Sequence, residues 1–511
     1  MKVALTLIDF LRRAELLYPD RVAVVDEPDQ PAESWGSITY GEMARRATAM
    51  AAGLDALGIG VGERVAIVSH NSARLLTALF GVSGCGRVLV PINFRLVAEE
   101  VSYIIKHSGA RVLLVDPELQ DALGPVECEM KWTIGAESDA RWMTFDVEPE
   151  PWEADEDATA TINYTSGTTA RPKGVQLTHR NVWLNAALFG WHMGVNERDV
   201  YMHVLPQFHC NGWGMLYAVT GMGGKHIIQR KADGKQILER IAEHGVTYWC
   251  GAPAVLNMIL DAAANWEGPI PGAGTLRCTI AGAPPPTRTI ERTIDELGWQ
   301  FNQIYGLTET SPLLTINRPR PEWDHLPTSE QATLLNRAGG PAIGVTIKID
   351  ESGEVCARSN VVMDGYWDQP DQTAMAIRDG YFHTGDGGSL DDSGYLTIAD
   401  RKKDVIISGG ENVSSIEVEN AIFQHPDITE VAVIGIPDEK WGELVTALVV
   451  TLPGSLLTEA DVIVWTKQKL AGYKCPKKVE FRTQLARTAT GKLQKFKLRE
   501  PFWQGYEKQV N

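Results

Sequence analysis

The sequence has no apolar run long enough to cross a membrane. A spanning helix needs about 20 consecutive apolar residues, and the opening MKVALTLIDFLRRAELLYPD is interrupted by Asp9, Arg12, Arg13 and Glu15. A signal peptide has a continuous apolar core, which these charged residues interrupt. We therefore expect neither a membrane span nor a signal peptide.

Paired cysteines are also missing. The seven cysteines are scattered and show no C-x-x-C spacing, which argues against a disulfide framework and against a zinc site. Isolated thiols are typical of a reducing compartment. A cytoplasmic location is therefore predicted.

Positive charge is scarce overall. With 48 Lys and Arg against 65 Asp and Glu the net charge is -17, and a general nucleic-acid binder needs a cationic surface. One segment reverses the balance between Lys467 and Arg499. Its cations are Lys474, Lys477, Lys478, Arg482, Arg487, Lys492, Lys495 and Lys497. A solvated surface is the ordinary explanation of such a run.

Compositional bias, internal repeats and low-complexity segments are absent. The hydrophobic fraction of 44% and the charged fraction of 22% are those of a globular protein. Single cores rarely exceed about 250 to 300 residues, so 511 residues predict at least two domains. Nothing requires oligomerisation for stability, although a homodimer is compatible with the sequence.

Residues 7 to 150 alternate amphipathic helical segments with short β-branched runs. Strands are expected at Val65–Val68, Val88–Pro91 and Val112–Val115, with a helix at Asn71–Gly81. This alternation predicts layered α/β structure with a largely parallel sheet. An acidic connector with prolines follows, and alternation resumes to about residue 340.

The pattern then changes twice. Short strands with turn signals begin at Thr346–Ala357 and predict a small antiparallel β subdomain. Beyond Asp400 a compact α+β unit is expected, with helices at Ser414–Phe423 and Glu459–Leu470 and strands at 431–434 and 446–451. We predict a large N-terminal domain, residues 1–402, and a small C-terminal domain, residues 403–511.

The segment YTSGTTARPKG, from Tyr164 to Gly174, follows a strand-like run at Ala160–Asn163. Its hydroxyls and backbone N–H groups can surround an oligophosphate, and Lys173 offers a charge to the outer oxygens. A flexible Ser/Thr/Gly linker is the alternative, because the segment is not a Walker sequence.

Two further segments place polar groups near expected strand ends. YGLTET follows Phe301–Ile304, which puts Thr308 and Glu309 where open α/β sheets bind ligands. Glu309 is a candidate Mg²⁺ ligand, and Tyr305 can lie against a nucleobase or belong to the core. Asp386 and Arg401 flank the antiparallel segment as a candidate ribose site, or as turn residues.

Read in order, these segments resemble the acyl-adenylate-forming superfamily of acyl- and aryl-CoA synthetases, peptide-synthetase adenylation domains and firefly-type luciferases. YTSGTTARPKGV resembles the phosphate loop, YGLTET the Thr-Glu motif and YFHTGD the ribose aspartate motif. DRKKDVIISGGENV resembles the hinge, and ARTATGKLQKFKLR the catalytic-lysine motif. The resemblance covers nearly the whole chain and implies ATP, Mg²⁺ and coenzyme A as cofactors.

The resemblance implies a role for each matching residue. The phosphates of ATP would be held by Thr165, Ser166, Gly167, Thr168, Thr169 and Lys173. The adenine and the adjoining nucleotide site would be formed by Gly282, Ala283, Pro284, Gln303, Tyr305, Gly306 and Thr308. Glu309 would bind Mg²⁺, while Asp386 and Arg401 would hold the ribose. Lys492 would be the adenylation lysine, and Lys403 the hinge.

An acid pocket and a coenzyme A tunnel are implied in the same way. The acid pocket would comprise His209, Asn211, Gly212, Trp213, Trp249, Gly251 and Ala281. The tunnel would be lined by Ser408, Gly409, Gly410 and Glu411, for which a tight turn is the alternative. The large tryptophans favour small, medium-chain or aromatic acids, unless they are structural.

Two positions depart from the family pattern. Ala170 replaces a usual glycine in the phosphate loop, and Gly387 follows Asp386 where an aliphatic residue is common. Neither departure removes a charged group, so activity is expected to survive.

The resulting expectation is an ATP-dependent acid–CoA ligase that forms an acyl-adenylate. His209, Thr165, Glu309 and Lys492 are its candidate catalytic residues. An amide-forming ligase with an amine acceptor is the nearest alternative. A luciferase-like oxygenase and an inactive binding module are also compatible with the motifs.

Overall fold

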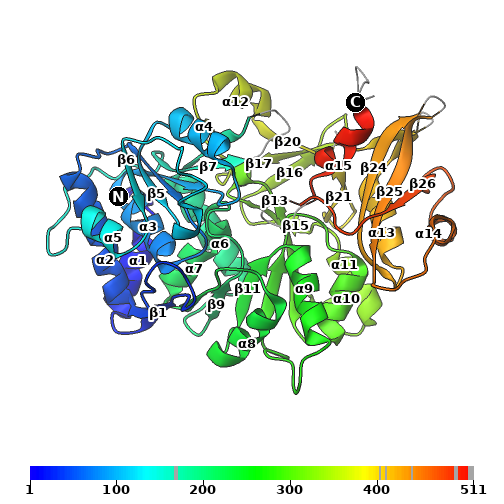
Figure 1. Cartoon of the computed structure of the whole chain (residues 1–511), viewed down its shortest axis with the longest axis horizontal. Coiled ribbons are helices and arrows are strands. Elements are labelled where there is room, and N and C mark those ends of the chain that lie inside the picture. The colour runs from blue at the N-terminus through cyan, green and yellow to red at the C-terminus, as the bar shows by residue number, and fades with distance from the viewer. Residues whose placement is uncertain (166–170, 402–403, 409–410, 439–440, 488–492, 505–511) are drawn as a thin grey trace.

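The computed structural model describes residues 1–165, 171–401, 404–408, 411–438, 441–487 and 493–504. Two large sheets with helices form most of the chain, and a small antiparallel sheet and a C-terminal α+β unit follow (Figure 1). The predicted fold class is therefore confirmed. Within the described part of the chain, no helix is long and apolar enough to cross a membrane.

The first large sheet has nine strands. In spatial order they are β15 (Gly340–Pro341), β14 (Leu313–Asn317), β13 (Gln300–Gly306), β12 (Arg277–Ile280), β11 (Tyr248–Gly251), β9 (Val200–His203), β10 (Lys225–Ile228), β1 (Val22–Val25) and β2 (Ser37–Thr39). The pairings from β13 through to β1 are parallel. The carboxyl ends of β11, β12 and β13 consequently lie at one edge.

The second large sheet has seven strands. They are β18 (Gly365–Tyr366), β8 (Lys173–Thr178), β7 (Thr159–Thr165), β4 (Val88–Ile92), β3 (Arg64–Val68), β5 (Ala110–Val115) and β6 (Met130–Thr133). Its strands from β7 to β6 pair in parallel, whereas β8 and β18 are antiparallel. The three strands predicted in the first 150 residues all lie in it.

Helices connect and cover these strands (Figure 1). In the N-terminal half they are α1 (Ile8–Leu17), α2 (Tyr40–Ala56), α3 (Ala73–Gly81), α4 (Ala98–Ser108), α5 (Ala136–Trp142), α6 (His179–Met193) and α7 (Met215–Met222). Four more follow: α8 (Gly234–His244), α9 (Pro253–Ala263), α10 (Thr287–Asp295) and α11 (Thr328–Leu335).

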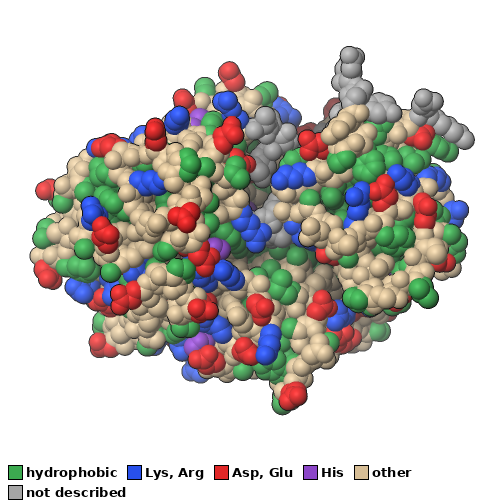
Figure 2. All heavy atoms as spheres, in the orientation of Figure 1, with side chains coloured by type: hydrophobic (Ala, Val, Ile, Leu, Met, Phe, Trp, Pro, Cys, Tyr) green, Lys and Arg blue, Asp and Glu red, His purple; other side chains and the backbone are tan. Residues whose placement is uncertain are grey.

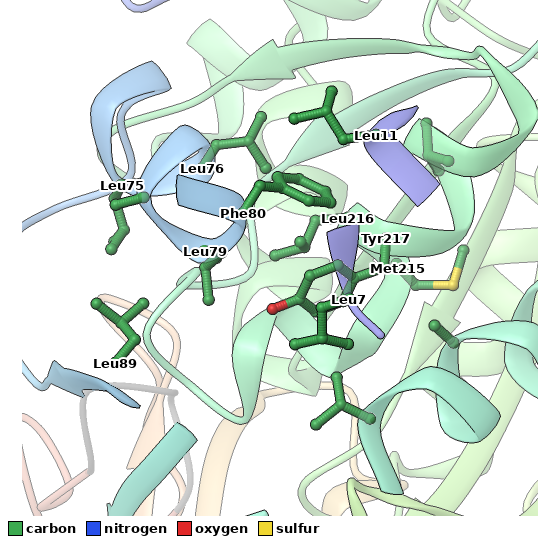
Figure 3. Packing of buried hydrophobic residues seen from close by; sticks show 14 of the residues in the cluster. Leu7, Leu11, Leu75, Leu76, Leu79, Phe80, Leu89, Met215, Leu216 and Tyr217 are labelled. Atoms are coloured by element: carbon green, nitrogen blue, oxygen red, sulfur yellow. The ribbon is translucent and has the colours of Figure 1, made fainter. Parts of the chain in front are cut away.

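Helix α3 shows how the sequence builds the main core. Its N-cap Ser72 accepts a hydrogen bond from the Leu75 N–H at 3.1 Å, which satisfies one of the free donors at the helix start. Leu76, Leu79 and Phe80 then pack with residues of α1 and α7 (Figure 3). Burying each such side chain contributes about 1.5 to 3 kcal/mol.

The small antiparallel sheet supplies part of the site. Its strands are β16 (Thr346–Ile349), β17 (Glu354–Arg358), β20 (Tyr381–Leu390), β19 (Ile377–Arg378) and β21 (Leu396–Arg401), with α12 (Pro370–Ala376) before β19. Asp386 lies on β20, where its Cα pairs with that of Arg401 on β21.

The C-terminal unit is a second α+β body, at the right of Figure 1. Its strands are β22 (Ile406–Ser408), β23 (Glu411–Val413), β24 (Ile428–Asp438), β25 (Gly442–Thr451) and β26 (Lys478–Phe481). Its helices are α13 (Ser415–Phe423), α14 (Glu459–Lys467) and α15 (Lys495–Trp503). It touches the N-terminal part where Arg288 Nη1 donates to the His425 carbonyl at 3.0 Å.

Candidate active site

A cavity of about 530 Å³ lies between the large N-terminal part and the C-terminal unit, where the surface is hollowed (Figure 2). It opens at the carboxyl edge of β12 and β13, as expected for ligand sites of open α/β sheets. The predicted nucleotide residues that line it are Gly282, Ala283, Pro284, Gln303, Tyr305, Gly306 and Asp386. The fold thus brings together three segments that are far apart in sequence.

Gln303 presents a polar group that the described protein does not satisfy. Its side chain is buried, and Oε1 has no hydrogen-bond partner among the described residues. Leaving a buried amide oxygen unpaired costs about 1 to 3 kcal/mol. Gln303 also lines the cavity, so a ligand with an N–H donor, such as an adenine amino group, fits this position.

Asp386, the predicted ribose ligand, is held by the predicted aromatic residue Tyr305. The Tyr305 hydroxyl donates to Asp386 Oδ2 at 2.8 Å, and Asp386 is almost fully buried. Tyr305 therefore orients the carboxylate while its ring faces the same cavity. The side chain of Arg401 lies outside the described part of the structure.

Gly306 is required by close packing of the backbone. A Cβ at this position would lie 1.5 Å from the carbonyl oxygen of Pro312. Only glycine therefore fits where β13 passes the Pro312 carbonyl group, just before the 3-10 turn η4 (Thr308–Thr310). The turn places Glu309 immediately after the sheet.

Glu309 contacts a residue that sequence reasoning missed. The Tyr366 hydroxyl donates to Glu309 Oε1 at 2.9 Å. Burial and the neighbouring Glu309 carboxylate raise the pKa of Tyr366, so the hydroxyl stays protonated. The only sequence signal was an aromatic residue in GYW, a pattern with no distinguishing chemistry.

Tyr366 also connects Glu309 with the predicted phosphate lysine. Lys173 Nζ lies 4.7 Å from the centre of the Tyr366 ring and donates to Gln372 Oε1 at 2.7 Å. Lys173 opens β8 and pairs with Thr165 at the end of β7. Ser166, Gly167, Thr168, Thr169 and Ala170 lie outside the described residues.

The segment after His209 forms a left-handed turn. The φ angles are 47° at Cys210, 52° at Asn211, 58° at Gly212, 59° at Trp213 and 80° at Gly214. Each non-glycine residue in this conformation costs about 1 to 2 kcal/mol. Such strain persists only where the surroundings enforce it, which occurs often at functional sites.

A buried polar network holds this turn against strand β7. Asn211 Nδ2 donates to Thr161 Oγ1 at 2.9 Å, and Asn163 Nδ2 donates to Asn211 Oδ1 at 3.2 Å. On the other side, Cys210 Sγ lies 3.8 Å from the Thr308 carbonyl oxygen. The predicted acid-pocket segment therefore contacts both strand β7 and the 3-10 turn η4.

Other predicted acid-pocket residues lie deeper in the sheet. The Trp249 ring is buried and meets Trp299 edge to face at 6.3 Å. The Ala281 N–H donates to the Gly251 carbonyl at 3.1 Å, so these two residues adjoin at the strand ends. Of the seven acid-pocket residues named above, none is among the described residues that line the cavity, although the adjoining Ala252, Gly282 and Ala283 of the same predicted segments do line it. The role of the seven in acid binding stays a prediction.

The C-terminal elements of the prediction are described only in part. Ser408 and Glu411 face each other as the end pair of the β22–β23 hairpin. Lys403, Gly409, Gly410 and Lys492 lie outside the described residues. Arg487 and Leu493, the described neighbours of the lysine motif, pair with each other and both line the cavity.

The basic run finds acids contributed by other elements. Lys474 pairs with Glu417 at 2.7 Å, and Arg487 pairs with Glu430 at 2.6 Å. Lys495 Nζ lies 2.8 Å from Glu419. Three cations of the run therefore pair with acids that lie outside it.

The chain is similar to known proteins over nearly its whole length. Residues 11–367 match the family described as AMP-binding enzyme, and residues 417–492 match its C-terminal domain. The 2-methylpropanoate–CoA ligase CCL4 of Humulus lupulus is 37% identical, over 97% of this chain and 95% of that protein. The 4-hydroxybutyrate–CoA ligase 2 of Metallosphaera sedula is 36% identical, over 97% and 94%.

A solved structure gives the same result. The anthranilate CoA ligase AuaEII in complex with anthranoyl-AMP superposes with a TM-score of 0.87 at 26% identity, over 98% of both chains. The resemblance to acyl-adenylate-forming enzymes is confirmed. This chain belongs to the AMP-binding enzyme family.

Proposed function

We propose that this protein is an ATP-dependent carboxylic acid–CoA ligase, which forms an acyl-adenylate with release of pyrophosphate and transfers the acyl group to coenzyme A. The observation that carries the proposal is the cavity formed by Gln303, Tyr305 and Asp386, beside which Glu309 and Lys173 share contacts with Tyr366. A base needs a hydrogen-bonding group, a ribose needs a carboxylate, and an oligophosphate needs a cation and a metal ligand.

Adenylation requires two anions to meet. A carboxylate has no good leaving group, and attack of its oxygen on the α-phosphate of ATP makes that oxygen part of AMP. The reaction needs positive charge where negative charge gathers. Lys173 would lie on the departing pyrophosphate, and Lys492 would bridge the carboxylate and the α-phosphate. Thr165, with Ser166 to Thr169, would bind the phosphate oxygens.

The residues around Glu309 fit a magnesium ion. Mg²⁺ in such enzymes takes one or two carboxylates together with substrate phosphates, and Glu309 is a carboxylate beside the proposed phosphate loop. When bound, the ion would neutralise charge on the phosphates. Tyr366 would hold one carboxylate oxygen of Glu309 in place.

The acid would lie beside the left-handed turn. His209, Asn211, Gly212 and Trp213 would border it, because Cys210 within this segment reaches the Thr308 carbonyl. The names of the relatives support a small or aromatic acid, since they specify 2-methylpropanoate, 4-hydroxybutyrate and anthranilate. Trp249, Gly251 and Ala281 would close the inner wall.

Transfer would use the C-terminal domain in a second orientation. We place the boundary at 402/403, with Lys403 as the hinge, and the pantetheine arm of coenzyme A would pass along Ser408 to Glu411. The relatives are named as CoA ligases, which favours a thiol acceptor over the amine of the alternative. Cytoplasmic location and homodimer formation stay predictions.

The test is a product analysis. Purified protein receives ATP, Mg²⁺, coenzyme A and one acid from a panel that includes the three named above. We expect AMP, pyrophosphate and an acyl-CoA, read by mass spectrometry. Replacement of coenzyme A by amino acids distinguishes the amide ligase. If no acid yields AMP, the proposal is wrong.

A further inference from the structure

Four side chains that can bind a metal gather on the small antiparallel sheet, outside the lining of the nucleotide cavity. Glu354 and Cys356 lie on β17, and His383 lies on β20 with its Cα directly opposite that of Cys356. Asp350 follows β16. Asp350, Cys356 and His383 place one ligand atom each within 4.8 Å of the others.

Two of the three distances to His383 Nδ1 match the edges of a metal tetrahedron, and the third is longer. Cys356 Sγ lies 3.4 Å from His383 Nδ1. Glu354 Oε2 lies 3.5 Å, and Asp350 Oδ2 3.9 Å, from the same nitrogen. Zinc bonds of about 2.3 Å to sulfur and about 2.0 to 2.2 Å to nitrogen or oxygen give separations of about 3.3 to 3.6 Å between tetrahedral ligands.

A single hydrogen bond at His383 Nδ1 does not account for all three of these neighbours. A neutral histidine nitrogen either donates one proton or accepts one, yet Nδ1 of His383 faces a thiol and two carboxylates. A Cys–His–acid relay would place the thiol and the acid on opposite ring nitrogens. Here all three groups gather on one nitrogen, which a shared metal ion would explain.

Neighbouring contacts hold the two carboxylates in this orientation. Asp350 Oδ1 accepts from the N–H groups of Ser352 at 2.8 Å and of Glu354 at 2.9 Å. Glu354 Oε1 accepts from the Gly385 N–H at 2.8 Å. The second oxygen of each carboxylate faces Nδ1. Outer contacts that orient ligands in this way are typical of metal sites.

Burial and nearby charge fit a metal bound through a thiolate. Cys356 is fully buried, and the His383 side chain is 9% exposed. Arg378 Nη2 lies 3.7 Å from Glu354 Oε2 and offsets part of the excess negative charge.

We propose that Asp350, Cys356 and His383 form a binding site for a divalent transition metal of the zinc class, with Glu354 Oε2 beside His383 Nδ1 as a neighbouring carboxylate. A sulfur and a nitrogen ligand favour zinc over magnesium or calcium. On binding, the thiol proton leaves to solvent and the sulfur takes the metal. The site would tie β17 to β20 three residues before Asp386. Cysteine spacing in the sequence did not predict this site, because its ligands come from separate strands.

Metal titration of the full-length protein tests this site. Chelator-treated protein receives Zn²⁺, and bound metal is counted after gel filtration. We expect about one tightly bound zinc per chain, and loss of that zinc in Cys356→Ser and in His383→Gln. Cys128→Ser is the matched control, because Cys128 is a half-buried thiol that donates to a carbonyl outside this cluster. It should retain the zinc.

Cobalt reports the ligand directly. Co²⁺ bound to a thiolate gives a charge-transfer absorption in the near ultraviolet, which we expect in the wild type and in Cys128→Ser but not in Cys356→Ser. Absence of this band in the wild type, or its persistence in Cys356→Ser, overturns the proposal. The cobalt spectrum of the wild type keeps the test decisive if a variant does not fold. Ligase activity plays no part in either readout.

Discussion

Removal of the Tyr366 hydroxyl tests whether Tyr366 orients Glu309 for binding the proposed Mg²⁺. In Tyr366→Phe the ring stays, so the contact of Lys173 with the ring at 4.7 Å is preserved. Only the 2.9 Å hydrogen bond to Glu309 Oε1 is lost. The substitution therefore separates orientation of the carboxylate from the position of the lysine.

The expected effect follows from the type of bond removed. A hydrogen bond to a charged group contributes about 1.5 to 3 kcal/mol, and each 1.4 kcal/mol or so corresponds to tenfold. Loss of an outer contact to a metal ligand typically weakens metal affinity or activity by about 10- to 100-fold. We expect the Mg²⁺ concentration for half-maximal velocity to rise within that range.

Pyrophosphate release, followed across a series of Mg²⁺ concentrations at saturating acid, measures this shift. Tyr217→Phe is the matched control, because the Tyr217 hydroxyl is buried and has no hydrogen-bond partner among the described residues. Removal of this hydroxyl breaks no hydrogen bond among the described residues, so the Mg²⁺ dependence should stay that of the wild type.

Two outcomes would contradict the reasoning. An unchanged Mg²⁺ dependence in Tyr366→Phe would show that the hydroxyl does not serve the metal. An equal loss of activity at every Mg²⁺ concentration, accompanied by a lower melting temperature, would assign Tyr366 a purely structural role.

Four further predictions concern the lysines, the backbone and pH. Lys492→Ala should abolish adenylate formation but spare transfer from a supplied acyl-adenylate; comparable loss in both half-reactions would refute its role. Lys403→Pro should slow transfer more than adenylation, and equal slowing would count against domain rotation. Gly306→Ala should cost about 3 kcal/mol or more of unfolding free energy, measured by denaturation, whereas Gly472→Ala, with open space at its Cβ, should be nearly neutral. Burial lowers the pKa of His179 from 6.5 to about 4, so between these values the unfolded chain binds a proton that the folded chain lacks. Stability should therefore decrease as the pH is lowered from 6.5 to about 4, by up to about 1.4 kcal/mol per pH unit, and less so in His179→Gln; parallel denaturation curves would contradict this.

The order of the elements was predictable from local patterns. Strand β3 and helix α3 were expected because β-branched residues favour strands and because Asn71–Gly81 reads as one amphipathic segment. The structure begins this helix two residues later, at Ala73, since Ser72 acts as the N-cap. The small antiparallel sheet was visible in its turn signals. Each of these features depends on neighbours in sequence.

The motifs also predicted candidate nucleotide residues, because each motif is a short continuous string. Gln303, Tyr305 and Asp386 were named from sequence, and the structure places all three around one cavity. Tyr366 was missed, since a single aromatic residue carries no signal until folding sets its hydroxyl against Glu309.

The amino-acid order by itself determined the family, the α/β architecture and the candidate residues of the nucleotide site, because motif chemistry and residue periodicity are local properties. Only the tertiary structure decided which side chains meet across strands. It set Tyr366 on Glu309, matched the basic run with distant acids and gathered Cys356 with His383 on paired strands. These contacts depend on strand register and on the crossing of distant segments, which local sequence does not encode.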